Sequence, residues 1–161
     1  MIRKSDFARL AIVVLAVLLF TLAAGDGLAG TDIPKSKGQT VYAPVYSHIY
    51  SGSREQRFNL AVTLSIRNTD PNHAITITAV DYFDSSGNLV EKYLPKAKTL
   101  AKMASIRYVV KESDIKGGSG ANFIVVWSSA EAVNVPIIET VMIGTQAQQG
   151  ISFTSRGQVI E

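Results

Sequence analysis

The chain has 161 residues, the usual size of one domain, and it contains no cysteine. The missing cysteine excludes a disulfide framework and an anchor through a lipidated cysteine. Lys and Arg number 16 against 13 Asp and Glu, and the pI is about 9.2. The first 29 residues hold three of the basic and two of the acidic residues, so the remainder has 13 against 11, a net charge of +2. Nucleic-acid-binding domains concentrate basic charge far more heavily, and we expect no nucleic-acid partner.

The N-terminus contains the three parts of a secretory signal peptide in their usual order. Residues 1–9 are short and positive, with Arg3, Lys4 and Arg9 against a single acidic residue. Residues 10–24 form an apolar run of fifteen residues without a charge. The tripeptide 27–29 then has small residues at its first and third places. We predict cleavage between Ala29 and Gly30, and export to the periplasm or the medium.

An uncleaved membrane anchor is the alternative for residues 1–29. A helix rises about 1.5 Å per residue, so fifteen residues span roughly 22 Å, less than the hydrocarbon core of about 30 Å. Asp26 prevents a simple extension of the apolar run. The length and the flanking residues therefore favour a signal helix that is removed. If the segment is retained, it is the only part expected to contact a membrane, the inner one.

Residues 30–38 are small and polar and contain Pro and Gly, which predicts a flexible lead-in. We expect residues 39–161 to form a single domain that begins with a strand over 39–50. The clearest signal follows at 58–68, where every second residue is apolar. Such alternation predicts a strand with one buried and one solvated face. The apolar positions are Phe58, Leu60, Val62, Leu64 and Ile66.

The next strand begins after a predicted turn at 68–73, where Pro can fix φ and Asn and Asp side chains can bond to the local backbone. Ile75 and Ile77 occupy odd-numbered positions of this strand, whereas Val80 and Tyr82 occupy even-numbered positions. A switch of parity within one strand predicts a β-bulge near residues 78–79.

Turn residues at 84–87 predict a hairpin that ends in a left-handed glycine. The segment 123–127 is apolar on both parities, so we place its strand centrally, with both faces covered. No helix is expected after residue 24. Further strand-like runs lie at 88–94, 105–111, 122–128, 137–144 and 151–154, with a short one near Val159.

Seven or eight short strands separated by turns predict an all-β fold. We expect an antiparallel two-sheet sandwich of the immunoglobulin-like type, preceded by the apolar signal helix. The segment 144–157 is polar but almost uncharged, with Ile151 and Phe153 between glycines. Apolar residues at these places predict a closing strand that pairs with the sheet; an edge that binds a partner is the alternative.

Four stretches carry a family resemblance: GQTVYAPVYSHIYSG (38–52), LSIRNTDPNHAITITAVDYFDSSGNLV (64–90), KESDIKGGSGANFIVVW (111–127) and VMIGTQAQQGISFTSRG (141–157). Together they resemble a bacterial family of small exported proteins known as domain of unknown function 3124. The resemblance covers nearly all of the chain after residue 38. It implies export and a β-rich fold, and it implies no activity and no site residues.

Large rings with polar tips alternate along the run 39–50. Tyr42, Tyr46, His48 and Tyr50 occupy even positions, which share one face of a continuous strand. Tyrosine offers flat apolar area and a hydroxyl, so this face is a candidate binding platform for a sugar or peptide. The plain alternative is packing against a neighbouring strand, since aromatic residues are common in strands without any ligand.

No pattern predicts catalytic or metal-ligating residues. The Gly-x-Ser-x-Gly elbow is missing, and the two histidines lie in different segments without any cysteine. We therefore expect no metal, no cofactor and a non-catalytic module that binds an envelope protein or glycan, or has a structural role there. The alternative is an enzyme acting on envelope polysaccharide, with carboxylates that meet in space, such as Asp81, Asp84 or Glu112.

Overall fold

The computed structural model describes residues 33–161, apart from 53, 54 and 147. The predicted signal helix and the cleavage site at Ala29 and Gly30 lie outside the described residues. Within the described part of the chain, no segment forms a helix with the length and apolarity that a membrane crossing requires.

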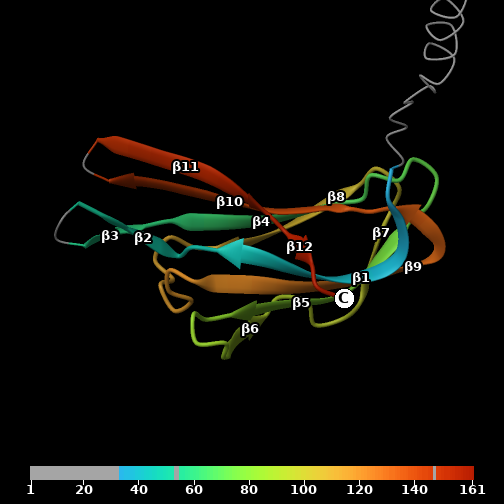
Figure 1. The fold of residues 1–161 in the computed structure, drawn as a ribbon, viewed down its shortest axis with the longest axis horizontal. Coiled ribbons are helices and arrows are strands. Elements are labelled where there is room, and N and C mark those ends of the chain that lie inside the picture. Colours follow the sequence, from blue (N-terminus) through green and yellow to red (C-terminus); the bar gives the residue numbers. More distant parts are fainter. Residues whose placement is uncertain (1–32, 53–54, 147) are drawn as a thin grey trace, which may run out of the picture. The chain divides into compact units, whose positions relative to one another are not determined.

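The described residues form an all-β domain, which confirms the all-β part of the predicted fold. Figure 1 shows the strands in chain order. They are β1 (Lys35–Val45), β2 (His48–Ser51), β3 (Gln56–Asn59), β4 (Ala61–Arg67), β5 (Ile75–Phe83), β6 (Leu89–Lys92), β7 (Lys98–Leu100), β8 (Ser105–Val110), β9 (Ala121–Asn134), β10 (Ile137–Gln146), β11 (Gln149–Arg156) and β12 (Gln158–Val159).

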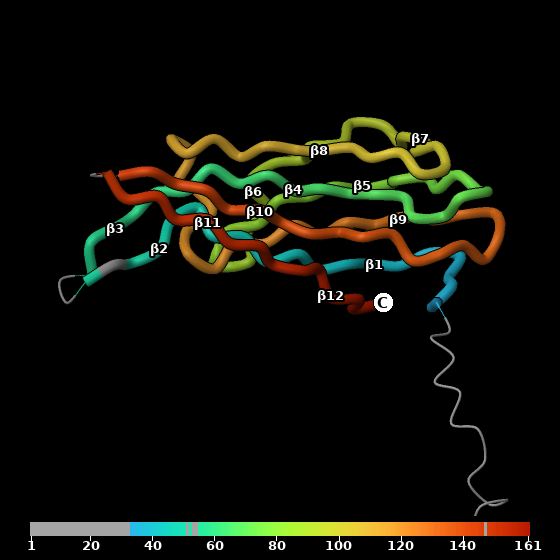
Figure 2. Tube along the Cα trace, turned by 90° about the horizontal axis from the view of Figure 1, so that it is seen from above, coloured from blue at the N-terminus to red at the C-terminus, as the bar shows by residue number. Residues whose placement is uncertain are grey.

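These strands make two large sheets and one hairpin, and every pair is antiparallel. The six-stranded sheet has the order β12-β1-β9-β5-β6, with β7 also paired to β5. The four-stranded sheet has the order β11-β10-β4-β8, and β2 and β3 pair with each other. Figure 2 shows β8 and β11 on opposite sides of the four-stranded sheet.

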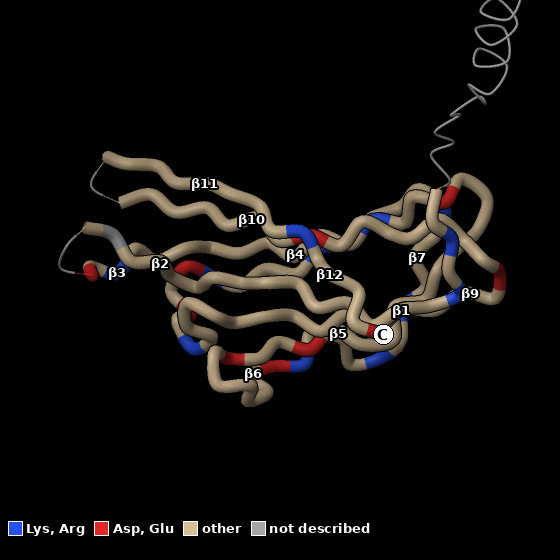
Figure 3. The backbone as a smooth tube through the Cα atoms, in the orientation of Figure 1, with Lys and Arg blue, Asp and Glu red and all other residues tan. Residues whose placement is uncertain are grey.

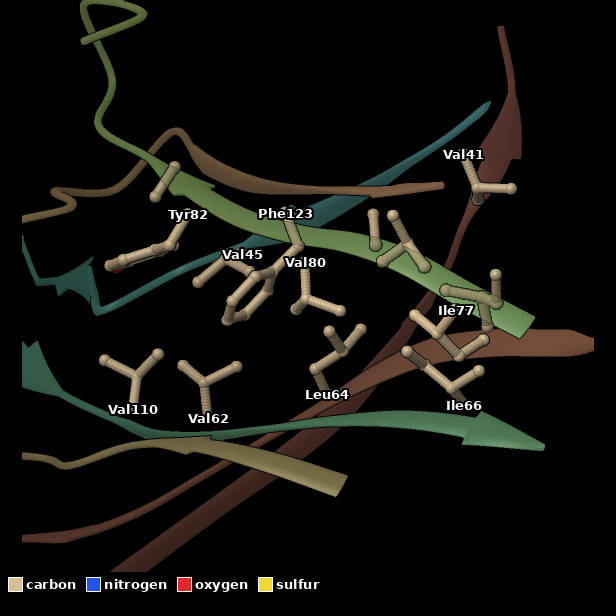
Figure 4. Close-up of a cluster of buried hydrophobic side chains, with 14 of the residues drawn as sticks. Val41, Val45, Val62, Leu64, Ile66, Ile77, Val80, Tyr82, Val110 and Phe123 are labelled. Atoms are coloured by element: carbon tan, nitrogen blue, oxygen red, sulfur yellow. The ribbon is translucent and has the colours of Figure 1, made fainter. Parts of the chain in front are cut away.

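The core lies between the two large sheets. In Figure 4, Val80 and Phe123 of the six-stranded sheet point toward Val62, Leu64 and Val110 of the four-stranded sheet. All five side chains are at most 1% exposed. Alternation with a period of two explains this arrangement, because it directs every second side chain of a strand to the same face.

The described chain passes between the two large sheets six times, and the links at two of these passages have only one or two residues. One is the short link from β9 to β10, and the other is Gly157, between β11 and β12. A Cβ atom at Gly157 would lie 2.7 Å from Cγ1 of Val41 and 3.0 Å from the carbonyl oxygen of Ile138. Only glycine fits here without displacing its neighbours, so this residue allows the last strand to join the six-stranded sheet.

Several local predictions are confirmed. The register of β5 against β9 shifts between Ile77 and Ala79, where the bulge was predicted. Gly87 has a φ of 82° in the turn between β5 and β6. The alternating apolar residues of 58–66 are all buried. β9 is the central strand between β1 and β5, and the segment 151–154 pairs with β10 as part of β11.

Other boundaries differ from the predictions. β1 begins at Lys35, inside the expected flexible lead-in, because β9 extends to Asn134 and gives Lys35 a partner. The expected strand 39–50 is divided between Val45 and His48. The N–H of Ser47 donates to the carbonyl of Gly118 there, which turns the chain out of the sheet. The division and the short strand β7 contribute to a total of twelve described strands instead of seven or eight.

Candidate anion-binding face

The predicted aromatic face does not form one surface. Tyr42 lies on the outer side of the six-stranded sheet, because its neighbours Val41 and Ala43 are buried in the core. Tyr46 lies beyond the end of β1, and its ring meets Phe153 of β11 edge to face, with 5.7 Å between the ring centroids. The break between Val45 and His48 thus leaves Tyr42 on β1 and Tyr46 in the link, whereas His48 and Tyr50 lie on the β2–β3 hairpin.

His48 and Tyr50 contact each other on β2. Their rings pack edge to face at 5.2 Å, and Nε2 of His48 lies 3.3 Å from the hydroxyl of Tyr50. Burial lowers the pKa of His48, and the nearby charge of Arg57 lowers it further. The imidazole is therefore neutral near pH 7. Nδ1 of His48 is buried without a hydrogen-bond partner among the described residues, and the pair forms a small packed contact on the hairpin.

The carboxylates suggested for catalysis have local partners or are exposed on a loop. Oδ2 of Asp81 lies 3.6 Å from Nζ of Lys92 on the neighbouring strand. Asp84 accepts the backbone N–H groups of Ser86 and Asn88 in its own hairpin turn. Glu112 is exposed in the loop after β8. None of these three carboxylates lines either of the two cavities described below.

A different group of residues surrounds a hollow of about 600 Å³ on the four-stranded sheet. It lies on the outer face, because its residues on β4 alternate with Val62, Leu64 and Ile66 of the core. Three strands contribute hydroxyls, guanidinium groups and a small apolar patch. The lining residues are Thr63, Ser65, Arg67, Ser105, Ile106, Arg107 and Val141.

Polar side chains in this hollow and beside it form a row across the sheet. The register places Arg107 of β8 opposite Ser65 of β4, Ser65 opposite Glu139 of β10, and Glu139 opposite Arg156 of β11. Nε of Arg67 donates to Oγ of Ser65 at 3.1 Å and lies 3.6 Å from Oε1 of Glu139. Ser65 is only 8% exposed although it faces outward. These contacts orient Arg67 along the floor of the hollow.

Positive charge exceeds negative charge on this face. Arg67, Arg107 and Arg156 are exposed on this face, and the one carboxylate of the row, that of Glu139, is paired with Arg67. Within the described residues, Arg107 and Arg156 have no acidic partner. A guanidinium group presents a planar fork of donors that matches carboxylate and phosphate oxygens. The face is therefore equipped to hold an anion, with hydroxyls beside it that can bond to sugar oxygens.

A second, smaller cavity of about 220 Å³ lies beside the β9–β10 and β11–β12 links, and Arg156 is one of its lining residues. Its walls are mostly apolar. The amide oxygen of Gln39, one of its lining residues, is buried without a hydrogen-bond partner among the described residues. The lining residues are Pro34, Gln39, Val41, Val135, Pro136, Ile137, Ile138, Arg156, Gly157 and Val159.

Sequence reasoning did not find the arginine face, because its members are far apart in the chain. Arg67 and Arg107 are separated by forty positions, and Arg156 is further still. The sequence did contain one signal, the alternation of polar and apolar residues along each strand. Arg67 occupies an odd-numbered position of β4, whose even-numbered positions are apolar. Arg107 likewise occupies an odd-numbered position of β8, the neighbouring strand, whose even-numbered positions are apolar. Strand order was needed to bring the two together.

The family model described as Protein of unknown function (DUF3124) matches residues 38–160. The chain belongs to this family. The resemblance drawn from the four sequence stretches is thus confirmed. A solved structure from Thermotoga maritima, described as Thermotoga maritima 1070, is similar at 10% identity with a TM-score of 0.45. The match covers 74% of this chain and 92% of that one. A comparison with curated proteins gave no match.

Proposed function

We propose that this DUF3124 protein is an exported, non-catalytic module that binds an anionic glycan of the cell envelope. The observation that carries the proposal is the hollow on the four-stranded sheet, where Arg67 and Arg107 stand beside the hydroxyls of Thr63, Ser65 and Ser105. Arginine supplies the charge that selects a carboxylate or phosphate, and the hydroxyls suit the many oxygens of a sugar.

Export is supported by the order of charged, apolar and small residues in the first 29 positions. We further propose that the described domain is an immunoglobulin-like sandwich. Two antiparallel sheets packed over a common core support this assignment. The enzyme alternative has no comparable support, because the described hollow is lined by arginine and hydroxyl groups and by no carboxylate.

Binding is tested with polygalacturonate as the acidic polysaccharide and dextran as the neutral one. We expect binding of polygalacturonate alone, with an affinity that falls as salt rises, because about 1 M salt shortens the Debye length to about 3 Å. A hydrogen bond to a charged group contributes about 1.5–3 kcal/mol. Arg67→Gln and Arg107→Gln should therefore each weaken binding by roughly tenfold or more.

The matched control is Arg57→Gln, which removes the same charge from the β2–β3 hairpin. It should leave the affinity for polygalacturonate within about twofold, since it lies on another element. Equal losses in all three variants would indicate only a general charge effect and overturn the proposed site. Equal binding of dextran and polygalacturonate would overturn the anionic ligand class.

Export is tested separately by N-terminal sequencing of the protein recovered from cell fractions. A mature chain that starts at Gly30, found outside the cytoplasm, is the expected result. A chain that still starts at Met1 in the membrane pellet would contradict cleavage and leave the anchor as the correct interpretation.

A further inference from the structure

Edge strands expose unpaired backbone groups, and proteins usually protect them with charges or by keeping them short. Four of the five edge strands of the two large sheets follow this rule within the described residues. β7 and β12 have three and two residues, β6 contains Glu91 and Lys92, and β8 has Arg107 near its middle. The fifth, β11, is eight residues long and carries no charge before Arg156.

The outward backbone groups of β11 follow from its register. The N–H of Gly157 donates to the carbonyl of Ile138 at 2.8 Å, and bonded pairs alternate along an antiparallel ladder. The odd-numbered residues of β11 therefore bond to β10. The even-numbered ones, Gly150, Ser152 and Thr154, direct their N–H and C=O groups away from the sheet. Among the described residues, none of these groups has a hydrogen-bond partner.

The position of β11 leaves room for another strand. Figure 2 shows it as the outermost strand of its sheet, and in Figure 3 the projecting part of the β10–β11 hairpin carries no charged residue. Ile151 and Phe153 face the core side but remain only half buried, in contact with the rest of the core. An added strand would cover the apolar surface that these two side chains still expose.

We propose that β11 pairs with β11 of a second copy of this chain, antiparallel and about a two-fold axis at Ser152. This occupant is favoured because the edge is complementary to itself. The outward groups of Ser152 meet the same groups of its copy, which forms a bonded pair. The inference is independent of the proposed ligand.

The side chains of the paired strands also match in this register. Phe153 faces Ile151 of the other copy, and aromatic and β-branched residues form favourable cross-strand pairs. Gly150 faces Thr154, so no bulky side chains collide there. Arg156 faces Gln148 of the other copy instead of a second arginine, so like charges do not meet. An acidic or basic partner strand would find no complementary charge over Gln149–Ser155.

The absence of cysteine gives a direct test. Ser152→Cys introduces one thiol, which in this pairing lies opposite its own copy. Cα atoms of a bonded antiparallel pair are about 5.5 Å apart, within the range that a disulfide spans. With the protein in the form recovered from cells, mild oxidation should convert most of this variant to a covalent dimer. The control is Ser105→Cys, an exposed residue on the opposite edge strand β8, which should form no disulfide-linked dimer.

A second measurement does not depend on cross-linking. The unmodified protein should sediment as a dimer in analytical ultracentrifugation at tens of micromolar, whereas Ser152→Lys should sediment as a monomer. An equimolar mixture of Ser152→Lys and Ser152→Glu should restore the dimer, because the opposed residues then attract each other. A monomeric unmodified protein, equal cross-linking of the two cysteine variants, or a dimer that survives Ser152→Lys would overturn the proposal.

Discussion

Asn68 should be among the residues to which the stability of this domain is most sensitive. It is 2% exposed at the end of β4. Its Nδ2 donates to the carbonyls of His73, Leu100 and Ala101 at 2.8, 3.3 and 3.0 Å. Its Oδ1 accepts the N–H of Asp70 at 3.0 Å. One side chain thus links the turn after β4 to the end of β7.

The expected cost of Asn68→Ala follows from these contacts. The amide has two donor hydrogens and one acceptor in use, and removing it leaves the buried groups around it unpaired. A buried polar group without a partner costs about 1–3 kcal/mol, and a typical internal hydrogen bond contributes about 1 kcal/mol. Partial relaxation reduces the sum of these costs. We expect the free energy of unfolding to fall by about 3 kcal/mol, a large part of the 5–15 kcal/mol typical of a domain.

The assay is urea denaturation followed by tryptophan fluorescence, since the single Trp127 is buried in the core. The slope of unfolding free energy against urea should not change, because the variant exposes the same surface when it unfolds. Asn88→Ala is the control. Its amide donates to Asp84 in an exposed turn at 3.1 Å, and its loss should cost no more than about 1 kcal/mol. A loss below about 1 kcal/mol for Asn68→Ala would refute the reasoning.

Two further predictions concern the stability of the protein in acid and the crossing from β11 to β12. Backbone N–H groups, that of Asn134 foremost, hold the pKa of Asp70 far below its ordinary 3.8. The stabilisation from its carboxylate is therefore complete above about pH 3.8 and is lost as the pH falls below that value, so unfolding curves of Asp70→Asn should depend less on pH in acid than those of the unmodified protein. Gly157→Ala should lower the midpoint of thermal unfolding by several degrees, as overpacking typically costs about 1–3 kcal/mol. Gly150→Ala, where a Cβ has no atom within 4 Å, is its control, and equal effects of the two alanines would contradict the steric explanation.

The parts of the fold that sequence predicts are those set by neighbouring residues. Alternation placed the buried residues of 58–66, and the parity switch after Ile77 located the bulge. Boundaries set by distant partners were missed. β1 begins at Lys35 only because Asn134 lies beside it, and the chain turns after Val45 because Ser47 bonds to Gly118. Neither partner is near in sequence, so no local pattern could reveal them.

Contacts between residues far apart in the sequence also explain why the predicted site differs from the one found. The aromatic residues of 39–50 were grouped on the assumption of a continuous strand, and the break after Val45 divides them. The arginine face became visible only when the register placed Arg107, Ser65 and Glu139 in one row. Asn68 shows the intermediate case. Its turn was predicted from composition, but its bonds to the end of β7 depend on a strand that was not expected.

The two proposals about the four-stranded sheet can be tested without disturbing each other. Neighbouring strands lie about 4.8 Å apart, so Arg107 on β8 is three strand spacings, roughly 14 Å, from the backbone of β11. Replacing Arg107 with a neutral residue therefore leaves the outward backbone N–H and C=O groups of Ser152 unchanged. A charge at Ser152 lies on the edge strand, outside the lining of the hollow. If an arginine variant loses the ligand but remains a dimer, and an edge variant becomes a monomer but keeps the ligand, then the face and the edge are separate functional surfaces of one sheet.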